Sequence, residues 1–217
     1  MADQDTGVCL AGRNIEALHA LARDLSGRRV NALPCRVDLE SPDEIIRLAQ
    51  SVERDLGRLD YLVHSAAIIS QATTEQARVE DFDRHYNLNV RAPYLLTQRL
   101  LPLLKAAHGQ VVFINSTAGL TAGARGGQYA ASKHALKAIA DSLREEVNAE
   151  GIRVLSVFLG RTATPMQASV FASEGRQYKP ELLMQPDDVA SVVVNALKLP
   201  RTAEVTEIRM RPLQKSY

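Results

Sequence analysis

The stretch Val111–Leu136, VVFINSTAGLTAGARGGQYAASKHAL, decides how the rest of the chain is interpreted. It begins as a buried strand, continues through a turn that carries Ser116 and a glycine-rich loop, and predicts a helix opening near Tyr129. Lys133 follows about one helical turn later, so we expect its side chain on the same face as that of Tyr129. A nearby positive charge favours the phenolate, and Tyr129 could then exchange a proton with an alcohol or a carbonyl. For this pair alone, the alternative is an exposed tyrosine beside a solvated lysine.

Length and composition predict a single globular domain spanning residues 1–217, because 46% of the residues are hydrophobic and 24% are charged. A net charge of +1 gives no electrostatic basis for binding nucleic acid or an anionic membrane. No apolar run approaches the roughly 18 residues of a membrane span. The N-terminal MADQDTG also lacks the basic and apolar regions of a signal peptide. We therefore expect a cytoplasmic protein that binds neither nucleic acid nor membrane.

Strand signals alternate with helix signals along the chain. Asn14 is placed to cap a first helix. Ser41, with glutamate at Glu44, has the pattern of a capping box that opens a second helix, and Gly57 ends that helix. This alternation predicts βαβ units, and hence an α/β fold of three layers with helices on both faces of a parallel sheet. Strands are expected at 8–11, 30–37, 59–63, 111–114, 154–158 and 205–210.

Two regions are expected to be irregular. Pro93 and Pro102 should kink or cut the long helix that follows the polar stretch 70–80. Residues 166–185 mix aromatic and polar side chains, and we expect a long loop there that closes over a substrate as a lid.

Ser116 lies thirteen positions before Tyr129, at the carboxyl end of its strand, where parallel α/β sheets place their ligand sites. With this spacing the chain resembles the short-chain dehydrogenase/reductase family, from about Val8 to the C-terminus. The resemblance implies a doubly wound, Rossmann-like parallel sheet. It also implies an active site made by the strand-end serine, the tyrosine and Lys133, and completed by an asparagine on the preceding long helix. The matching asparagine here is Asn89.

The resemblance implies hydride transfer between a nicotinamide cofactor and a small carbonyl or secondary alcohol substrate. Ser116 would donate a hydrogen bond to the substrate oxygen, and Tyr129 would act as general acid or base. Lys133 would lower the pKa of the tyrosine and bind the nicotinamide ribose, while Asn89 would hold a water in the proton path. The family also implies a homodimer or homotetramer built on the two helices that carry Asn89 and Tyr129.

Residues near the first two strands bear on which cofactor is bound. Arg13 follows the first strand, where a basic side chain can pair with the 2′-phosphate of NADP, and no acidic residue stands there to bind a free 2′-hydroxyl. NADP is therefore expected in preference to NAD. The alternative is an exposed arginine at a helix start. By resemblance, Asp38 hydrogen-bonds the adenine and Leu39 lies beside its ring.

Two further segments resemble cofactor-binding loops of the family. After the third expected strand the family has Asn-Asn-Ala-Gly, whereas this chain has HSAA at 64–67. The resemblance assigns His64 and Ala66 to the cofactor site: the small residue allows close approach to a ribose, and the asparagine contacts are lost. LGRTAT at 159–164 resembles Pro-Gly-x-x-x-Thr, which places Thr162 and Thr164 at the nicotinamide.

The first βα unit of the family is missing from this sequence. A dinucleotide fold of this kind begins with a strand, a glycine-rich turn and a helix whose N-terminus receives the pyrophosphate. No Gly-x-x-x-Gly-x-Gly occurs before Val8. In the order 3-2-1-4-5-6 the absent strand lies mid-sheet, so two neighbouring strands should lack a ladder partner. Either the sequence omits residues of the functional protein, which we favour, or another segment closes the gap, or a truncated form holds its cofactor weakly.

The sequence leaves other functions to compare with a reductase. A relative that keeps the fold but binds or regulates without turnover is the main alternative, because the phosphate-binding turn is absent. A hydrolase using Ser116 and Lys133 lacks the nucleophile elbow. No cluster of His, Cys or carboxylates has metal-ligand spacing, and Cys9 and Cys35 are expected to be reduced core thiols.

Overall fold

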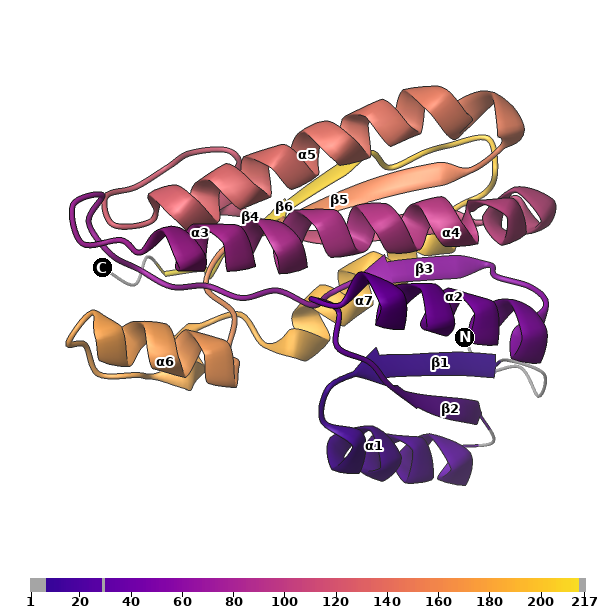
Figure 1. Ribbon diagram of the computed structural model, residues 1–217, viewed down its shortest axis with the longest axis horizontal. Coiled ribbons are helices and arrows are strands. Elements are labelled where there is room, and N and C mark those ends of the chain that lie inside the picture. The colour runs from indigo at the N-terminus through magenta and orange to yellow at the C-terminus, as the bar shows by residue number, and fades with distance from the viewer. Residues whose placement is uncertain (1–6, 29, 215–217) are drawn as a thin grey trace.

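The computed structural model describes residues 7–28 and 30–214, in which parallel strands alternate with helices (Figure 1). This confirms the predicted α/β class. None of the described helices is long and apolar enough to cross a membrane. The strands are β1 (Gly7–Gly12), β2 (Asn31–Arg36), β3 (Tyr61–His64), β4 (Gln110–Ser116), β5 (Arg153–Leu159) and β6 (Glu207–Met210). The α-helices are α1 (Ile15–Gly27), α2 (Pro42–Leu56), α3 (Val79–Tyr86), α4 (Ala92–Ala107), α5 (Gly127–Val147), α6 (Pro165–Ser173) and α7 (Pro186–Leu197).

The strands form two separate parallel sheets. One holds β1 and β2, and the other has the order β3-β4-β5-β6. In the second sheet, β4 and β5 pair from Gln110↔Arg153 to Ser116↔Leu159, so their carboxyl ends lie side by side. No strand of the described residues joins β1 to β3, which is the mid-sheet interruption expected from the sequence.

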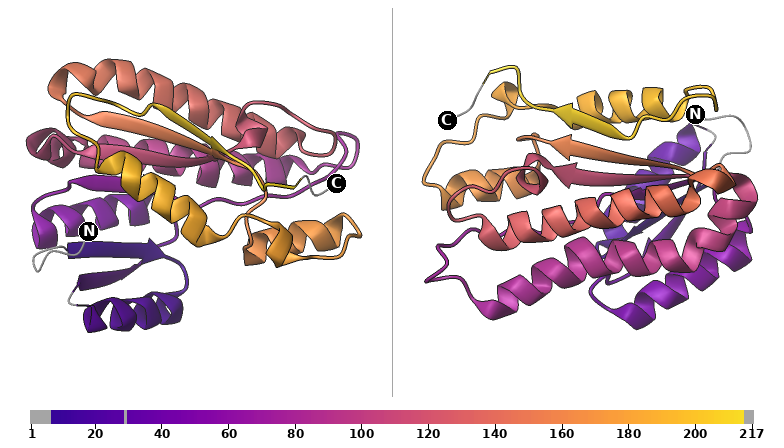
Figure 2. Two further views of the ribbon diagram at one scale, coloured as in Figure 1. Left: turned by 180° about the vertical axis from the view of Figure 1, so that it is seen from behind. Right: turned by 90° about the horizontal axis from the view of Figure 1, so that it is seen from above.

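Helices cover both faces of the larger sheet. Seen from above, α2, α4 and α5 form one layer, and α7 lies beyond the strands on the other side (Figure 2). The larger core cluster lies under α2, α4 and α5 and includes the fully buried Phe113 and Leu104. The smaller one joins both central strands to α7 through Val112, Leu155, Val157, Val189, Val193 and Leu197.

The local signals at the first two helices operate largely as expected. Asn14 accepts a hydrogen bond from the amide of Ala17 at 3.0 Å, and Gly57 ends α2 in a left-handed conformation with φ 63°. The capping box at α2 is only half formed. Ser41 accepts from the amide of Glu44 at 3.4 Å, but the Glu44 carboxylate accepts from the amide of Asp38 at 2.7 Å instead of turning back to the cap.

The long helix runs from α3 to α4 through a π-helical turn, Asn87–Arg91, and the prediction that Pro102 would cut it was wrong. Pro102 lies inside α4. Because proline has no N–H, Pro102 donates no hydrogen bond to the carbonyl of Gln98. Gln98 is an exposed residue, so water can donate to its carbonyl instead. Pro93 is the second residue of α4, in the first turn of a helix, where a proline N–H would not be needed.

The expected loop at 166–185 contains helix α6, so this prediction was also wrong in part. Thr164 caps α6 by accepting from the amide of Gln167 at 3.2 Å, and Pro165 occupies the first turn. Threonine followed by proline is a helix-start signal that the sequence displays. The rest of the segment holds a short 3-10 turn, Pro180–Leu182.

Candidate active site

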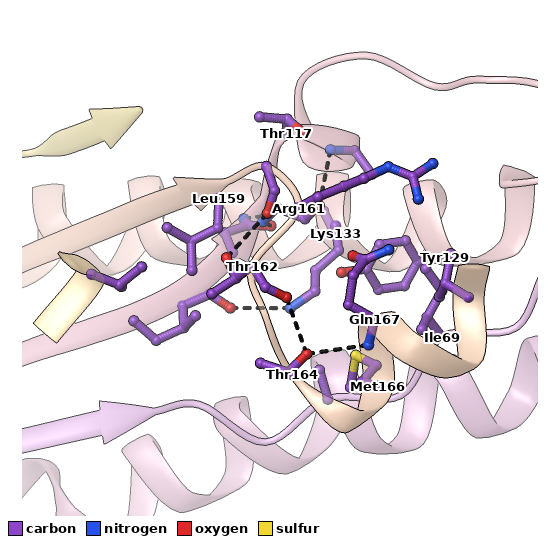
Figure 3. A pocket seen from close by; sticks show the side chains of 18 of the residues that line it. Ile69, Thr117, Tyr129, Lys133, Leu159, Arg161, Thr162, Thr164, Met166 and Gln167 are labelled. Atoms are coloured by element: carbon purple, nitrogen blue, oxygen red, sulfur yellow. Dashed lines mark hydrogen bonds between the residues drawn. The ribbon is translucent and has the colours of Figure 1, made fainter. Parts of the chain in front are cut away.

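A cavity of about 780 Å³ opens at the carboxyl ends of β3, β4 and β5 (Figure 3). Its walls come from these strand ends, the first turns of α5, helix α6 and one face of α7. This is the edge at which parallel α/β sheets bind ligands. Five of the sequence-predicted site residues line it: Ser116, Tyr129, Lys133, Thr162 and Thr164.

Lys133 is buried in the second turn of α5, with 2% of its surface exposed. Its ammonium donates to the carbonyl oxygen of Ile114 in β4 at 3.1 Å, and lies 5.9 Å from the centre of the Tyr129 ring (Figure 3). Burial lowers the pKa of Lys133 to about 8, because the charged form loses its hydration. The shared face predicted for the two side chains is confirmed.

The pKa of Tyr129 is raised, contrary to the sequence-based expectation. Burial of the phenol is the main cause, since it disfavours the phenolate, and a hydrogen bond with the side chain of Ser116 acts in the opposite direction. Lys133 does not reverse this rise in the pKa of Tyr129. Its ammonium is hydrogen-bonded to the Ile114 carbonyl, and burial lowers its own pKa. The phenol of Tyr129 is therefore protonated at neutral pH.

Ser116 ends β4 and is held by its neighbours. Its hydroxyl oxygen accepts from the amide of Ala118 at 3.1 Å, and its hydroxyl hydrogen is available to the side chain of Tyr129. The side chain of Asn115 accepts from the Ser116 amide at 2.8 Å and donates to the carbonyl of Lys133 at 3.1 Å. Gly119 must be glycine here, because a Cβ would lie 2.8 Å from both the Asn115 amide oxygen and the Lys133 carbonyl oxygen. These contacts fix the end of β4 against α5.

Asn89 lies in the π-helical turn and is almost fully buried. Its Nδ2 donates to the carbonyl of Ile68 and to the hydroxyl of Ser132, both at 3.0 Å, and its Oδ1 accepts from the amide of Ile68 at 2.9 Å. The Asn89 side chain thus fixes the segment after β3, and it is not among the residues that line the cavity. Its water-holding role stays a prediction.

The residues expected at the adenosine end lie at the smaller sheet and do not line the cavity. Arg13 follows β1, has 61% of its side chain exposed, and comes within 3.8 Å of the Glu40 carboxylate. Asp38 follows β2 and accepts from the amide of Glu40 at 2.9 Å. Leu39 packs against the larger core cluster. Arg13 is therefore free to turn toward a ligand, whereas Asp38 is engaged in its own turn.

His64 is directed away from the cavity. Its Nε2 lies 2.8 Å from the hydroxyl of Thr97 in α4, and its ring stacks on Phe113 with centroids 5.0 Å apart. Desolvation lowers the pKa of His64 to about 3, so the imidazole is neutral. Val63 lines the cavity instead, because side chains alternate along a strand, and Ala66 is exposed just beyond β3.

The loop between β5 and α6 brings both predicted threonines to the cavity (Figure 3). Thr162 donates to the carbonyl of Gly160 at 3.3 Å, and Thr164 donates to the carbonyl of Thr162 at 3.4 Å. Sequence analysis missed polar residues beside them, although Arg161 lies within the very loop that resembles a nicotinamide-binding segment. The missed cavity residues are Gln71, Arg161, Gln167 and Glu174.

The arrangement is suited to proton transfer next to a buried cation. Within residues 7–28 and 30–214, no group of three or more His, Cys, Asp or Glu residues is placed to hold a metal ion. A phenol, a hydroxyl and an ammonium meet at one cavity whose walls are otherwise largely apolar.

Residues 1–175 match the sequence model of the family described as short chain dehydrogenase. An uncharacterised oxidoreductase of Staphylococcus aureus (strain USA300) is 29% identical over 213 residues, which cover 97% of this chain and 88% of that protein. An alcohol dehydrogenase from the archaeon Thermococcus sibiricus, solved in complex with 5-hydroxy-NADP, shares the fold, with a TM-score of 0.87, 22% identity and coverage of 97% and 88%. A metagenomic short-chain oxidoreductase in complex with NADP has a TM-score of 0.81, 28% identity and coverage of 96% and 86%.

Proposed function

Because the chain belongs to the short-chain dehydrogenase family, we propose that it is an NADP-dependent oxidoreductase acting on a small carbonyl or secondary alcohol. The observation that carries this proposal is the meeting of Ser116, Tyr129 and Lys133 at one cavity on the carboxyl edge of the larger sheet. The cofactor, when bound, supplies or accepts the hydride. The chain's own residues hold the substrate oxygen and move the proton.

Two hydroxyl groups would hold the substrate oxygen. The oxygen of Ser116 already accepts from the amide of Ala118, so its hydroxyl hydrogen, which is shared with Tyr129 in this structure, would turn to the substrate oxygen. Tyr129 donates the second hydrogen bond and gives up its proton as charge develops on the substrate oxygen. The raised pKa of Tyr129, caused mainly by burial, keeps the phenol protonated at neutral pH, which suits reduction of a carbonyl. Oxidation of an alcohol requires the phenolate and is expected to be faster at higher pH.

The donor set of Lys133 fits the ribose of a nicotinamide cofactor. An ammonium carries three N–H donors, and among the described residues its one hydrogen-bond acceptor is the carbonyl of Ile114. Two donors therefore remain for vicinal hydroxyls at the cavity. Thr162 and Thr164 line the same wall and offer hydroxyl and backbone groups to a carboxamide.

Arg13 supports NADP over NAD, because its exposed guanidinium has only a distant carboxylate at 3.8 Å and can pair with a 2′-phosphate. The interruption of the sheet between β1 and β3 favours the second candidate function, a relative that binds or regulates without efficient turnover.

We also propose a homodimer or homotetramer through α3 and α4. Phe82 and Tyr86 stack at 5.3 Å while each remains 39% exposed, and Tyr94 is 52% exposed on the following helix. Aromatic side chains of this kind gather at protein interfaces. Light scattering of the Tyr94→Lys variant should give a smaller particle than wild type, whereas Leu199→Lys, at an exposed residue after α7, should not.

The decisive experiment measures NADPH consumption by purified protein with a panel of aldehydes and ketones. Wild type should turn over at least one of them, and Tyr129→Phe should not. Saturable NADPH binding without turnover of any carbonyl or alcohol would instead support the regulatory relative.

A further inference from the structure

Arg161 places a cation on the cavity wall that the reaction chemistry does not use. It follows β5 directly, lines the cavity, and has 27% of its side chain exposed (Figure 3). Its Nη2 donates to both carboxylate oxygens of Glu174, at 2.8 and 2.9 Å. Its Nη1 is buried and has no hydrogen-bond partner among the described residues.

The surrounding groups leave positive charge in excess. Arg176 shares the same carboxylate, with Nη1 at 3.3 Å from Glu174, and Gln71 donates to it at 3.3 Å. The guanidinium carbons of Arg161 and Arg176 lie 4.6 and 5.0 Å from the centre of the Phe171 ring. Two guanidinium groups therefore face one carboxylate, and both are held by the same ring.

The free charge is directed at an anion rather than a cation. Among the described residues that line the cavity, Glu174 is the one carboxylate, and both of its oxygens already accept from Arg161. A cationic ligand would find no free partner there. A buried N–H group without an acceptor costs free energy, and charge-assisted hydrogen bonds to a carboxylate are the strong ones. A carboxylate seated in the cavity would give Nη1 the acceptor that it lacks.

We propose that Arg161 binds a carboxylate of the substrate, so that the substrate class is an oxo acid or the corresponding hydroxy acid. This inference rests on the proposed function. In the reduction, a hydride from the nicotinamide forms the new C–H bond, the carbonyl π electrons move to oxygen, and that oxygen takes the proton of Tyr129. The carboxylate is unchanged and serves to orient the molecule.

Glu174 has a positioning role in this arrangement. It follows α6, and its contact with Gln71 ties that helix to the segment after β3, as does the hydrogen bond from the hydroxyl of Ser173 to Gln71 at 3.3 Å. Arg161 is thereby oriented before a ligand arrives, which lowers the entropy lost on binding.

The test compares a keto acid, 4-oxopentanoate, with its methyl ester, which keeps the ketone and removes the charge. Wild type should favour the acid. In Arg161→Gln, KM for the acid should rise roughly ten- to hundredfold, while KM for the ester changes less than about twofold. Arg161→Lys should recover part of the preference, because the charge returns without the planar fork.

Arg176→Gln is the matched control. It removes the same charge and has the same partners, Glu174 and Phe171, but does not line the cavity. Its ratio of acid to ester should stay close to that of wild type. Equal losses for acid and ester in Arg161→Gln, or the same shift in Arg176→Gln, would mean that Arg161 is a structural strut, and the proposal would be wrong.

A binding measurement separates this proposal from the proposed function. Calorimetric titration with pentanoate and with pentanamide, neither of which can react, should show a preference for the carboxylate that Arg161→Gln abolishes. That result would stand even if no carbonyl were reduced. Absence of the preference in wild type would overturn the carboxylate site, whatever the activity.

Discussion

The side-chain amide nitrogen of Asn89 lies 3.0 Å from the hydroxyl oxygen of Ser132, and that hydroxyl donates in turn to the carbonyl oxygen of Tyr129 at 2.7 Å. Ser132, one residue before Lys133, thereby connects the π-helical turn to the first turn of α5, where Tyr129 lies. Asn89 also brackets the backbone of Ile68 through both polar atoms of its amide. The position of Tyr129 therefore depends on a residue that does not itself line the cavity.

Replacing Asn89 with alanine should destabilise the protein by about 2 kcal/mol or more, because it leaves the partly buried backbone groups of Ile68 without partners and removes the hydrogen bond to Ser132. Urea unfolding measures this loss. Ser132→Ala removes two hydrogen bonds, whereas Asn89→Ala removes three, so Ser132→Ala should cost less. If Asn89→Ala lowered the free energy of unfolding by less than Ser132→Ala does, the larger structural role given to Asn89 would be wrong.

Tyr129→Phe should abolish carbonyl reduction, because it removes the transferable proton and leaves a ring that packs as before. Ser116→Ala should lower kcat by on the order of two to three decades, the usual effect of removing one oxyanion donor. Steady-state kinetics on folded, purified variants check both. Wild-type turnover by Tyr129→Phe would remove Tyr129 from the mechanism.

Arg13→Asp should shift the cofactor preference from NADP toward NAD, since it removes a phosphate partner and adds an acceptor for a ribose hydroxyl. The measure is the ratio of kcat/KM for the two cofactors. Arg23→Asp makes the same charge change at an exposed position of α1 and should leave that ratio unchanged. An unchanged ratio in Arg13→Asp as well would mean that another residue recognises the 2′ position.

The burial of Lys133 should make stability depend on pH. Its folded pKa of about 8 lies below the ordinary 10.5, so below pH 8 the folded protein carries the full cost of a buried charge. As pH rises from 8 toward 10.5 the folded state releases this proton first, and the free energy of unfolding should rise by at most roughly 3 kcal/mol. Lys133→Met should remove this rise in urea unfolding curves taken across that range.

Lys137 provides a control of opposite sign on the same helix. Its hydrogen bonds to Asp141 and Glu207 raise its pKa, so its stabilising contribution is present at neutral pH and is lost as pH rises through the folded pKa. In Lys137→Met, the fall in the free energy of unfolding at high pH should therefore become smaller, whereas Lys133→Met should remove a rise. If the free energy of unfolding depended on pH in the same way in both variants, the assignment of Lys133 as a desolvated cation would be wrong.

A version of the chain extended at its N-terminus by a strand, a glycine-rich turn and a helix should bind NADP much more tightly than residues 1–217. Amide groups at a helix N-terminus would then hold the pyrophosphate, whereas the groups identified here reach toward the two ends of the cofactor. The added strand should also raise the melting temperature by pairing with β1 and β3. Calorimetric titration and thermal melts test both effects, and equal affinity of the two versions would mean that unidentified residues hold the pyrophosphate.

The parts of the fold that sequence could predict depend on local chemistry. Asn14 and Gly57 act within one turn of their own helices, so their effects were readable. The hydrogen bond of Glu44 could not be predicted from the sequence. Its carboxylate accepts from the amide of Asp38, outside its helix, and tertiary structure sets that partner. The prediction for Pro102 was wrong because the free energy cost of a proline within a helix depends on the exposure of the residue four positions earlier, here Gln98, whose carbonyl loses its donor.

The candidate site divides in the same way. Helical spacing placed Tyr129 and Lys133 on one face, and the resemblance to the family joined Ser116, at its strand end, to that pair. The raised pKa of Tyr129 could not be predicted, because it depends on how far distant walls desolvate the phenol. Arg161 was missed for a similar reason: its partner Glu174 follows a helix that was taken for a loop.

The interruption between β1 and β3 has a consequence for how the molecule opens. Backbone hydrogen bonds do not cross it in the described residues, and side chains packed under α2, among them Val37 and Ile45, are what hold the β1–α1–β2 unit to the rest. In native-state hydrogen exchange, the amides of β1 and β2 should therefore exchange together through a low-energy opening that leaves β4 and β5 protected. Ile45→Ala should speed exchange in the first group alone.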